Sequence, residues 1–224
     1  MQRRVLYSLL SCLLACGPGD AAPPEASATV AAERAGGTVL FLGTSLTAGY
    51  GLTPDQAYPA RIQERIDAAG LGLRVINAGV SGDTSAGGLR RLDWLLRQPV
   101  RVLIIELGAN DMLRGQNPEA MRENLQAIID RTRAAHPNVE IVIAGMRAAR
   151  NLGRSYAERF ETVFDELAQQ NRAVLIPFLL ENVATVRKLN QSDGIHPTAA
   201  GHRIIAETVW RALEPVLRRV AGTR

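Results

Sequence analysis

The stretch Val100–Leu107, which reads VRVLIIEL, decides the fold of this chain. Its apolar residues follow one another almost without a break, and four of them stand in a row at positions 102–105. A strand with one face in water alternates apolar and polar residues, whereas a strand buried on both faces is apolar nearly throughout. The stretch therefore predicts a strand in a parallel sheet that is covered on both sides.

The rest of the chain alternates short apolar runs with segments of helical spacing. The apolar runs predict four more strands, and apolar residues three and four positions apart predict five helices. This alternation is typical of an α/β fold, in which a mostly parallel five-stranded sheet forms the middle of a three-layer α/β/α sandwich. The expected strands are 38–42, 73–76, 139–144 and 173–176, and the expected helices are 59–69, 86–96, 118–135, 155–170 and 198–220.

The size of the chain fits one such domain. With 224 residues, of which 46% are hydrophobic, the chain can form a substantial core. It contains no internal repeat and no sign of a second domain. We therefore expect one folded domain over residues 38–220, and we expect it to be a monomer.

The charged residues exclude two classes of function. The formal net charge is +4, and two of the positive charges are Arg3 and Arg4, which lie in a leader that we expect to be removed. No basic run follows that would track a nucleic-acid backbone, so we expect no nucleic-acid binding. A P-loop ends in Gly-Lys-Ser or Gly-Lys-Thr, but the single lysine, Lys188, precedes Leu189. Nucleotide hydrolysis by that route is therefore excluded.

The N-terminal segment has the features of a bacterial secretory signal. Residues 1–15 combine a positive start with an apolar run that is too short for a permanent membrane-spanning helix. The run closes with Leu13-Leu14-Ala15-Cys16, which resembles a lipobox, the motif whose cysteine becomes the lipidated first residue of the mature protein. Two alternatives are lipidation at Cys12, which leaves a shorter apolar region, and ordinary secretion after cleavage near Ala21-Ala22.

The segment after the signal is expected to be a tether. Residues 16–37 start with the expected lipidated Cys16 and are rich in Ala, Pro, Gly and Glu without an apolar period, which is typical of a flexible linker. With Cys16 lipidated, no cysteine remains for a disulfide. Gly17 follows the cysteine, rather than the aspartate that resembles an inner-membrane retention signal. We therefore expect a cell-envelope protein that faces the periplasm, anchored preferably in the outer membrane, or else a secreted one.

A serine directly after the first expected strand is a candidate nucleophile. Ser45 lies in GTSLTAG, residues 43–49, whose glycines permit a tight turn that presents the hydroxyl at the start of a helix. Backbone N–H groups at such a turn also stabilise negative charge. Taken alone, the segment fits a helix N-cap serine better than a nucleophile. It is not Gly-x-Ser-x-Gly, so the nucleophile elbow of the α/β-hydrolases does not apply.

A histidine near the C-terminus is a candidate base for that serine. His196 follows Asp193 by three residues, so the carboxylate can accept the Nδ1–H of the imidazole and leave Nε2 for Ser45. The other two histidines fit less well, because His136 precedes a proline in a surface-type loop and His202 lies inside an expected helix. A metal site would need more ligands than Asp193 and His196, and the sequence offers no convincing cluster.

Two further polar groups are candidate donors to an oxyanion. The Asn110 side-chain amide follows the strongest strand, and Gly79, in NAGVSG at 77–82, can offer a backbone N–H without a side chain in the way. Each segment alone is ordinary turn chemistry. However, Ser45, Gly79 and Asn110 are all expected just after a strand, and the carboxyl ends of parallel strands meet at one edge of the sheet. We therefore expect one active site there.

These blocks resemble those of the SGNH hydrolase superfamily, also called GDSL esterases and lipases, over residues 38–217. Within it, they are most similar to the bacterial branch of multifunctional acyl thioesterases, lysophospholipases and arylesterases. The resemblance implies a flavodoxin-like SGNH fold, Ser45 as nucleophile, His196 as base and Asp193 as its orienting carboxylate. It also implies an oxyanion hole from the Ser45 N–H, the Gly79 N–H and the Asn110 amide, with no cofactor and no metal. The matching blocks are GTSLTAGYG at 43–51, NAGVSGDT at 77–84, LGAND at 107–111 and DGIHP at 193–197.

Two departures from the family pattern concern the turn and the substrate. Thr44 stands where the family usually has aspartate, so we expect altered support of the turn. The segment 145–153, GMRAARNLG, corresponds to a substrate-side loop in which relatives tend to have apolar and proline residues at the positions of Ala148, Ala149 and Arg150. The acyl-chain preference is therefore not defined by the resemblance.

The sequence thus predicts a serine esterase that hydrolyses acyl esters through an acyl-enzyme intermediate. Lysophospholipids, aryl esters and short-to-medium acyl esters are the expected substrates. Acyl thioesters rank lower, since a secreted enzyme rarely meets acyl-CoA. Two other readings stay open: a carbohydrate O-deacetylase, and a non-catalytic envelope lipoprotein that binds a lipid or a partner. The retention of Ser45, Asp193 and His196 together argues against the last.

Overall fold

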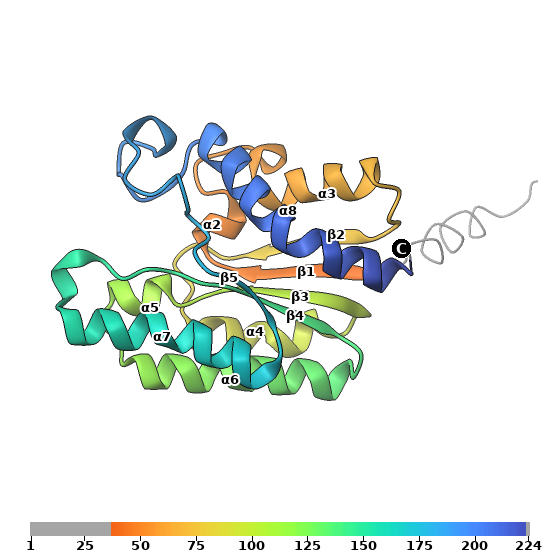
Figure 1. Cartoon of the computed structure of the whole chain (residues 1–224), viewed down its shortest axis with the longest axis horizontal. Coiled ribbons are helices and arrows are strands. Elements are labelled where there is room, and N and C mark those ends of the chain that lie inside the picture. The colour runs from red at the N-terminus through yellow and green to blue at the C-terminus, as the bar shows by residue number, and fades with distance from the viewer. Residues whose placement is uncertain (1–36, 223–224) are drawn as a thin grey trace, which may run out of the picture. The chain divides into compact units, whose positions relative to one another are not determined.

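The computed structural model describes residues 37–222, which form a parallel five-stranded sheet with helices on both sides (Figure 1). The order of the strands in the sheet is β2-β1-β3-β4-β5, and every neighbouring pair is parallel. The predicted α/β/α sandwich is therefore confirmed. The strands are β1 (Thr38–Gly43), β2 (Arg74–Gly79), β3 (Val100–Glu106), β4 (Glu140–Ala144) and β5 (Val174–Ile176).

Two of the three inner strands, β1 and β3, are among the most deeply buried elements of residues 37–222. All six residues of β1 are buried, and in β3 only Arg101 is exposed. Both strands have sheet neighbours on either side and helices above and below, so their side chains find apolar partners on both faces. The unbroken apolar pattern of residues 102–105 follows from this position.

Helices cover both faces of the sheet. Figure 1 shows α3 (Tyr58–Ala68) and α8 (Ala199–Ala221) on one side, and α4 (Ser85–Leu95), α6 (Pro118–Ala135) and α7 (Arg154–Asn171) on the other. Each of the five buries an apolar stripe, as Ile205, Val209 and Leu213 do in α8. Among residues 37–222, no helix has both the length and the apolar character needed to cross a membrane.

The boundaries of the long elements agree with the expected ones to within about three residues, whereas the short elements were not anticipated. These are the helices α2 (Ser45–Ala48) and α5 (Ala109–Leu113) and the 3₁₀ turns η1 (Pro54–Gln56), η2 (Arg150–Leu152) and η3 (Arg187–Leu189). Elements of three to five residues are too short for an apolar period. One expectation was wrong: β2 continues to Gly79, so Gly79 ends a strand instead of following it. The strand is longer than expected because β2 stays paired with β1 as far as Gly43, the partner of Gly79.

A buried histidine links α8 to α3. His202 is 1% exposed, and its Nδ1 accepts the backbone N–H of Tyr58 at 3.1 Å. The two rings also stack, with centroids 6.1 Å apart. Burial disfavours the charged imidazolium and lowers the pKa of His202 from 6.5 to about 4. The residue therefore serves packing.

This buried histidine predicts a specific dependence of stability on pH. Between pH 6.5 and pH 4 the unfolded chain binds a proton at His202 that the folded chain does not bind. The free energy of unfolding should therefore fall as the pH drops through this range, with His202 contributing about 3 kcal/mol of the loss. Urea unfolding at pH 7 and pH 4 of the wild type and of His202→Gln, whose amide can still accept the Tyr58 N–H, measures this share. Equal losses in both proteins would contradict the prediction.

Candidate active site

The serine expected to be the nucleophile begins the short helix that follows β1. Ser45 is the first residue of α2, and Thr44 is its N-cap, with its side chain accepting the Leu46 N–H. The turn is tightly enclosed: a Cβ on Gly43 would lie 2.0 Å from Thr47 Oγ1, and one on Gly79 would lie 2.2 Å from the Ala48 nitrogen. Only glycine fits at these two positions, so α2 sits directly against the ends of β1 and β2.

The structure brings the expected catalytic residues together, although 151 positions separate Ser45 from His196. The distance from His196 Nε2 to Ser45 Oγ is 3.0 Å. On the other side of the ring, Nδ1 lies 2.7 Å from Asp193 Oδ2. Since the carboxylate accepts, Nδ1 carries the hydrogen, and Nε2 is free to accept the Ser45 hydroxyl proton. This is the geometry required for general-base activation of a serine.

The position and charge of Asp193 follow from its hydrogen bonds. Besides the imidazole, it accepts the backbone N–H groups of Ile195 at 2.9 Å and His196 at 3.0 Å. These hydrogen bonds lower the pKa of Asp193 from 3.8 to about 2, and the bond from the His196 side chain contributes most. Its carboxylate therefore stays ionised at every pH at which the enzyme can be expected to work.

The His196 loop is held by residues that the sequence did not single out. Gln191 donates through Nε2 to the Tyr50 carbonyl at 2.7 Å and to the Pro197 carbonyl at 3.1 Å, and its backbone N–H donates to the His196 carbonyl at 2.7 Å. The Tyr50 ring lies against the imidazole, with centroids 4.5 Å apart. Tyr50 lies in a sequence block shared with the family, whereas no sequence pattern identifies Gln191 as a residue of the site.

The two expected oxyanion donors differ in their surroundings. Asn110, in α5, faces the same cleft as Ser45 and His196, and its Nδ2 donates one hydrogen to the Asp83 carbonyl at 2.8 Å, which leaves the other. The Gly79 N–H instead donates to the Asn77 side chain at 3.0 Å, and Gly79 does not line the cleft. Asn77 also donates to the Thr47 carbonyl at 2.8 Å, so it joins the end of β2 to α2. A role for Gly79 as an oxyanion donor stays a prediction.

An arginine connects the serine turn to the loop that orients Asn110. Arg91, in α4, donates through Nε to Asp83 Oδ2 at 2.7 Å and through Nη2 to the Gly43 carbonyl at 3.0 Å. Asp83 in turn accepts the Asn110 amide through its backbone carbonyl. One guanidinium thus fixes the end of β1 relative to the oxyanion side of the site. Spacing alone could not identify this residue, because its partners lie 8 and 48 positions away.

The structure shows which contacts Thr44 makes in the serine turn. The Thr44 hydroxyl, at the position where the family usually has aspartate, donates to the buried Glu106 carboxylate at 3.0 Å to each oxygen. It also accepts the Leu46 N–H at 3.4 Å. Threonine can therefore both cap α2 and bind a carboxylate without bringing a second negative charge into a buried site.

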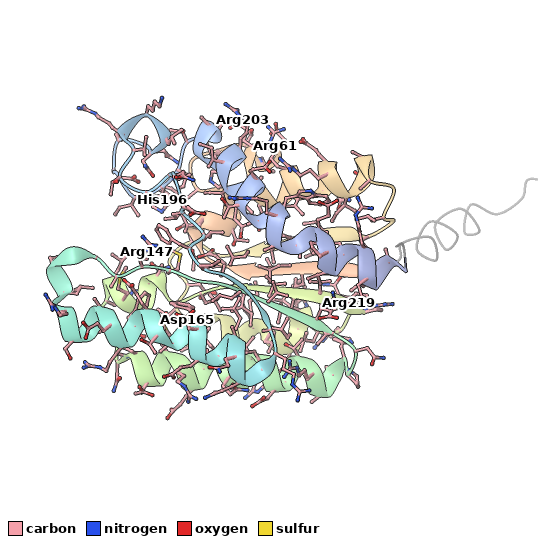
Figure 2. All side chains as sticks on the ribbon, in the orientation of Figure 1. Arg61, Arg147, Asp165, His196, Arg203 and Arg219 are labelled. Atoms are coloured by element: carbon pink, nitrogen blue, oxygen red, sulfur yellow. The ribbon has the colours of Figure 1, made fainter. Side chains whose placement is uncertain are left out.

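Next to these groups lies a cleft of about 1220 Å³. Arg147, from the loop 145–153, lies with its guanidinium 4.7 Å from the centre of the Phe178 ring. Figure 2 shows Arg147 and His196 at the same end of the sheet. Besides the polar catalytic groups, the lining includes apolar side chains, among them Met112, Leu113, Met146, Phe178 and Leu180. Such a cleft can accept an acyl chain next to the serine.

The expected lipidation site is not part of this arrangement. Cys16, the expected lipidation site, lies outside the described residues. Within residues 37–222, no three His, Cys, Asp or Glu side chains are grouped in a way that could hold a metal ion.

Fold and site together define a class. A parallel α/β/α sandwich with a Ser-His-Asp constellation at the carboxyl ends of its strands has the arrangement of a serine hydrolase. The family profile described as GDSL-like lipase/acylhydrolase matches residues 41–204. The chain belongs to this family and is an ester hydrolase.

Two curated relatives and one crystal structure illustrate the similarity. Esterase TesA of Pseudomonas aeruginosa is 40% identical over 186 residues, which cover 83% of this chain and 92% of that protein. Thioesterase 1/protease 1/lysophospholipase L1 of Escherichia coli is 37% identical over 181 residues, 80% of this chain and 85% of that protein. The crystal structure of TesA superimposes with a TM-score of 0.76 at 39% identity, over 80% of this chain and 99% of that one.

The geometry of Asn110 generates a kinetic prediction. If its free amide hydrogen stabilises the oxyanion, Asn110→Ala should lower kcat by about 10²-fold with little change in KM, because the contact forms only in the transition state. Steady-state kinetics with a p-nitrophenyl ester measures both constants. Asn124→Ala is a matched control, since it also loses a side-chain amide hydrogen bond, to Ser85 Oγ, but lies outside the cleft. A change confined to KM would make Asn110 a substrate-binding residue.

Proposed function

We propose that this chain is a serine esterase that acts on oxyesters, with lysophospholipids and aryl or short-to-medium acyl esters ranking above acyl thioesters. The observation that carries the proposal is the hydrogen-bonded series from Ser45 Oγ through His196 to Asp193, at 3.0 and 2.7 Å. It opens onto a largely apolar cleft. A nucleophile, an oriented base and an acyl-sized space are what this chemistry needs.

The proposed reaction has two steps. Ser45 Oγ attacks the acyl carbon while its proton passes to His196 Nε2, and Asp193 stabilises the resulting imidazolium. The Ser45 N–H and the Asn110 amide stabilise the oxyanion. The imidazolium protonates the departing alcohol, which leaves an acyl-Ser45 ester. Water, activated by His196, then attacks this ester and releases the acid.

The exposed apolar side chains support a lipid-like substrate. Among the described residues, five large hydrophobic side chains are exposed. Four of them, Tyr50, Val80, Leu113 and Ile195, lie within five positions of Ser45, Gly79, Asn110 or His196. Exposed apolar groups gathered at one place mark a binding surface. Tyr50, Leu113 and Ile195 also line the cleft, so an acyl chain can leave the serine along an apolar rim.

The substrate-side loop supports room for more than a short acyl group. Ala148 and Ala149 line the cleft with small side chains. The Ala148 N–H donates to Glu161 at 2.9 Å, which ties the loop to α7. The proposed preference for oxyesters over thioesters has a different basis, namely the expected location of the enzyme. The secretory leader is expected to export the chain, and an exported enzyme rarely meets acyl-CoA.

A substrate panel with a nucleophile variant tests the proposal. We expect hydrolysis of p-nitrophenyl acetate, octanoate and palmitate and of a lysophospholipid, with kcat/KM for the lysophospholipid above that for an acyl-CoA. Ser45→Ala should lose at least about 10³-fold in kcat on every ester while staying folded, and a fluorophosphonate should label the wild type alone. EDTA should leave the rates unchanged.

Other outcomes would point to the other readings. Faster release of acetate from an acetylated sugar than from any lipid or aryl ester would make the chain a carbohydrate O-deacetylase. A folded protein with neither hydrolysis nor labelling would be a non-catalytic lipoprotein. Labelling of Ser45→Ala at the wild-type rate would exclude Ser45 as the nucleophile.

The location of the enzyme is a separate proposal, based on the sequence of residues 1–37. We propose that Cys16 is lipidated and that the monomeric hydrolase domain faces the periplasm from the outer membrane. Neither a second copy of the chain nor a nucleic acid is needed, because all the proposed catalytic groups come from one chain.

The proposed anchor predicts where the protein is found. Acyl chains at Cys16 hold a protein at a bilayer by burying methylenes, at about 0.8 kcal/mol each. Cys16→Ser should therefore move the enzyme from the membrane fraction to the soluble fraction, whereas Cys12→Ser, the matched control, should leave it in the membrane. Mass spectrometry of the mature N-terminus identifies the modified residue. An unmodified N-terminus well past Cys16 in the soluble fraction would indicate an ordinary secreted enzyme.

A further inference from the structure

A buried carboxylate lies directly beneath the turn that carries Ser45, and the proposed reaction does not use it. Glu106, the last residue of β3, is 0% exposed. No lysine or arginine among the described residues forms an ion pair with it within 4.0 Å. A buried carboxylate without a cation is costly unless hydrogen bonds satisfy it. Its position in the middle of the sheet therefore calls for an explanation.

Four donors from two residues satisfy Glu106. Its Oε2 accepts the backbone N–H groups of Thr44 at 2.8 Å and Thr47 at 3.2 Å, and the Thr47 hydroxyl at 2.8 Å. The Thr44 hydroxyl lies 3.0 Å from both carboxylate oxygens. Thr44 and Thr47 flank Ser45 on the two sides. One carboxylate therefore holds the backbone of the turn both before and after the nucleophile.

The direction of these hydrogen bonds fits an ionised carboxylate. The Thr47 hydroxyl has a single hydrogen, which it gives to Glu106, so the Tyr58 hydroxyl, 2.7 Å away, donates to Thr47. Tyr58, in α3, is itself 0% exposed. Burial raises the pKa of Glu106, while the bonds from Thr44 and Thr47 oppose this rise. The ionised Glu106 carboxylate is therefore satisfied without a change in the orientation of any of these hydroxyl groups.

The space for the carboxylate is provided by a glycine. A Cβ on Gly43 would lie 2.7 Å from Glu106 Oε2 and 2.0 Å from Thr47 Oγ1. Gly43 and Glu106 are register partners on neighbouring strands. The sequence thus combines a glycine, two threonines and a glutamate from two strand ends in one contact. Filling of the core alone would call for an apolar side chain at position 106.

We propose that Glu106 is a positioning residue for the reaction: its carboxylate fixes the turn from Thr44 to Thr47, and thereby holds Ser45 Oγ within reach of His196 Nε2. The residue touches neither substrate nor the reacting atoms, and it acts through the serine turn. The inference rests on ester hydrolysis by Ser45, but not on which ester is hydrolysed. Misplacing a reacting group by about 1 Å costs about 10²-fold in rate, so the effect is measurable.

Two substitutions of Glu106 separate positioning from mere burial. In Glu106→Gln the amide oxygen can take the place of Oε2 and keep three of the donors, while the amide nitrogen donates to the Thr44 hydroxyl. In Glu106→Leu all four donors lose their acceptor. With a p-nitrophenyl ester, we expect kcat to fall by less than about 10-fold for Gln and by about 10²-fold or more for Leu, with KM little changed in both.

A pair of threonine variants provides the matched control. Thr47→Val removes the hydroxyl between Tyr58 and Glu106, and Thr132→Val removes an equally buried hydroxyl, which donates to the Ile128 carbonyl at 2.7 Å inside α6. Both should lose stability, as measured by urea unfolding, and Thr47→Val should lose more because its hydroxyl has two buried partners. Only Thr47→Val should lose kcat, by about 10-fold, together with a slower rate of labelling by a fluorophosphonate.

The proposal fails on any of three results. A folded Glu106→Leu protein with wild-type kcat overturns it. So does a loss of rate in Thr132→Val equal to that in Thr47→Val, because the effect would then be one of stability. If Glu106→Leu does not fold, Thr47→Val decides, and wild-type kcat in that variant overturns the proposal. Absence of ester hydrolysis in the wild type, assayed alongside, would speak against the proposed function instead.

Discussion

The parallel pairing of β1 with β2 and β3 is the constraint on which the site depends. Its register places Gly43 beside Gly79 on one side and beside Glu106 on the other. Parallel strands end at a common edge, so the segments that leave these three ends start from neighbouring points. The serine turn, the loop to Asp83 and the Asn110 helix are those segments. A shift of one residue in either pairing would move Glu106 away from the serine turn or a side chain into the space of Gly79.

Two carboxylates near the serine illustrate how environment sets the role of a charge. Asp193 is partly open to water and accepts three donors, one of them the His196 imidazole, and its pKa falls to about 2. Glu106 is fully buried and accepts donors from the serine turn alone, and burial raises its pKa. The first charge is suited to stabilising an imidazolium that appears during the reaction. The second is suited to holding a fixed structure that does not change.

Much of this arrangement could be predicted from local patterns. Continuous apolar residues identified β3, helical spacing identified the five long helices, and the Asp193–His196 spacing placed a carboxylate next to an imidazole. The end of β2 was missed because Asn77 and Gly79 are turn-type residues, and only pairing with β1 extends the strand through them. Gln191, Arg91 and Glu106 were missed because their partners include residues far away along the chain, which no local pattern reports.

The sequence by itself determined the class of fold, the order of the elements and the identity of the groups brought to one edge of the sheet. These properties follow from periodicity and from short motifs, and both are local. The tertiary structure alone decided that Glu106 lies under Ser45, that the Gly79 N–H is taken up by Asn77, and that Arg91 joins β1 to the Asp83 loop. Such contacts depend on register and side-chain direction across strands, because hydrogen bonds form only over about 3 Å and sequence spacing does not fix distances of that size.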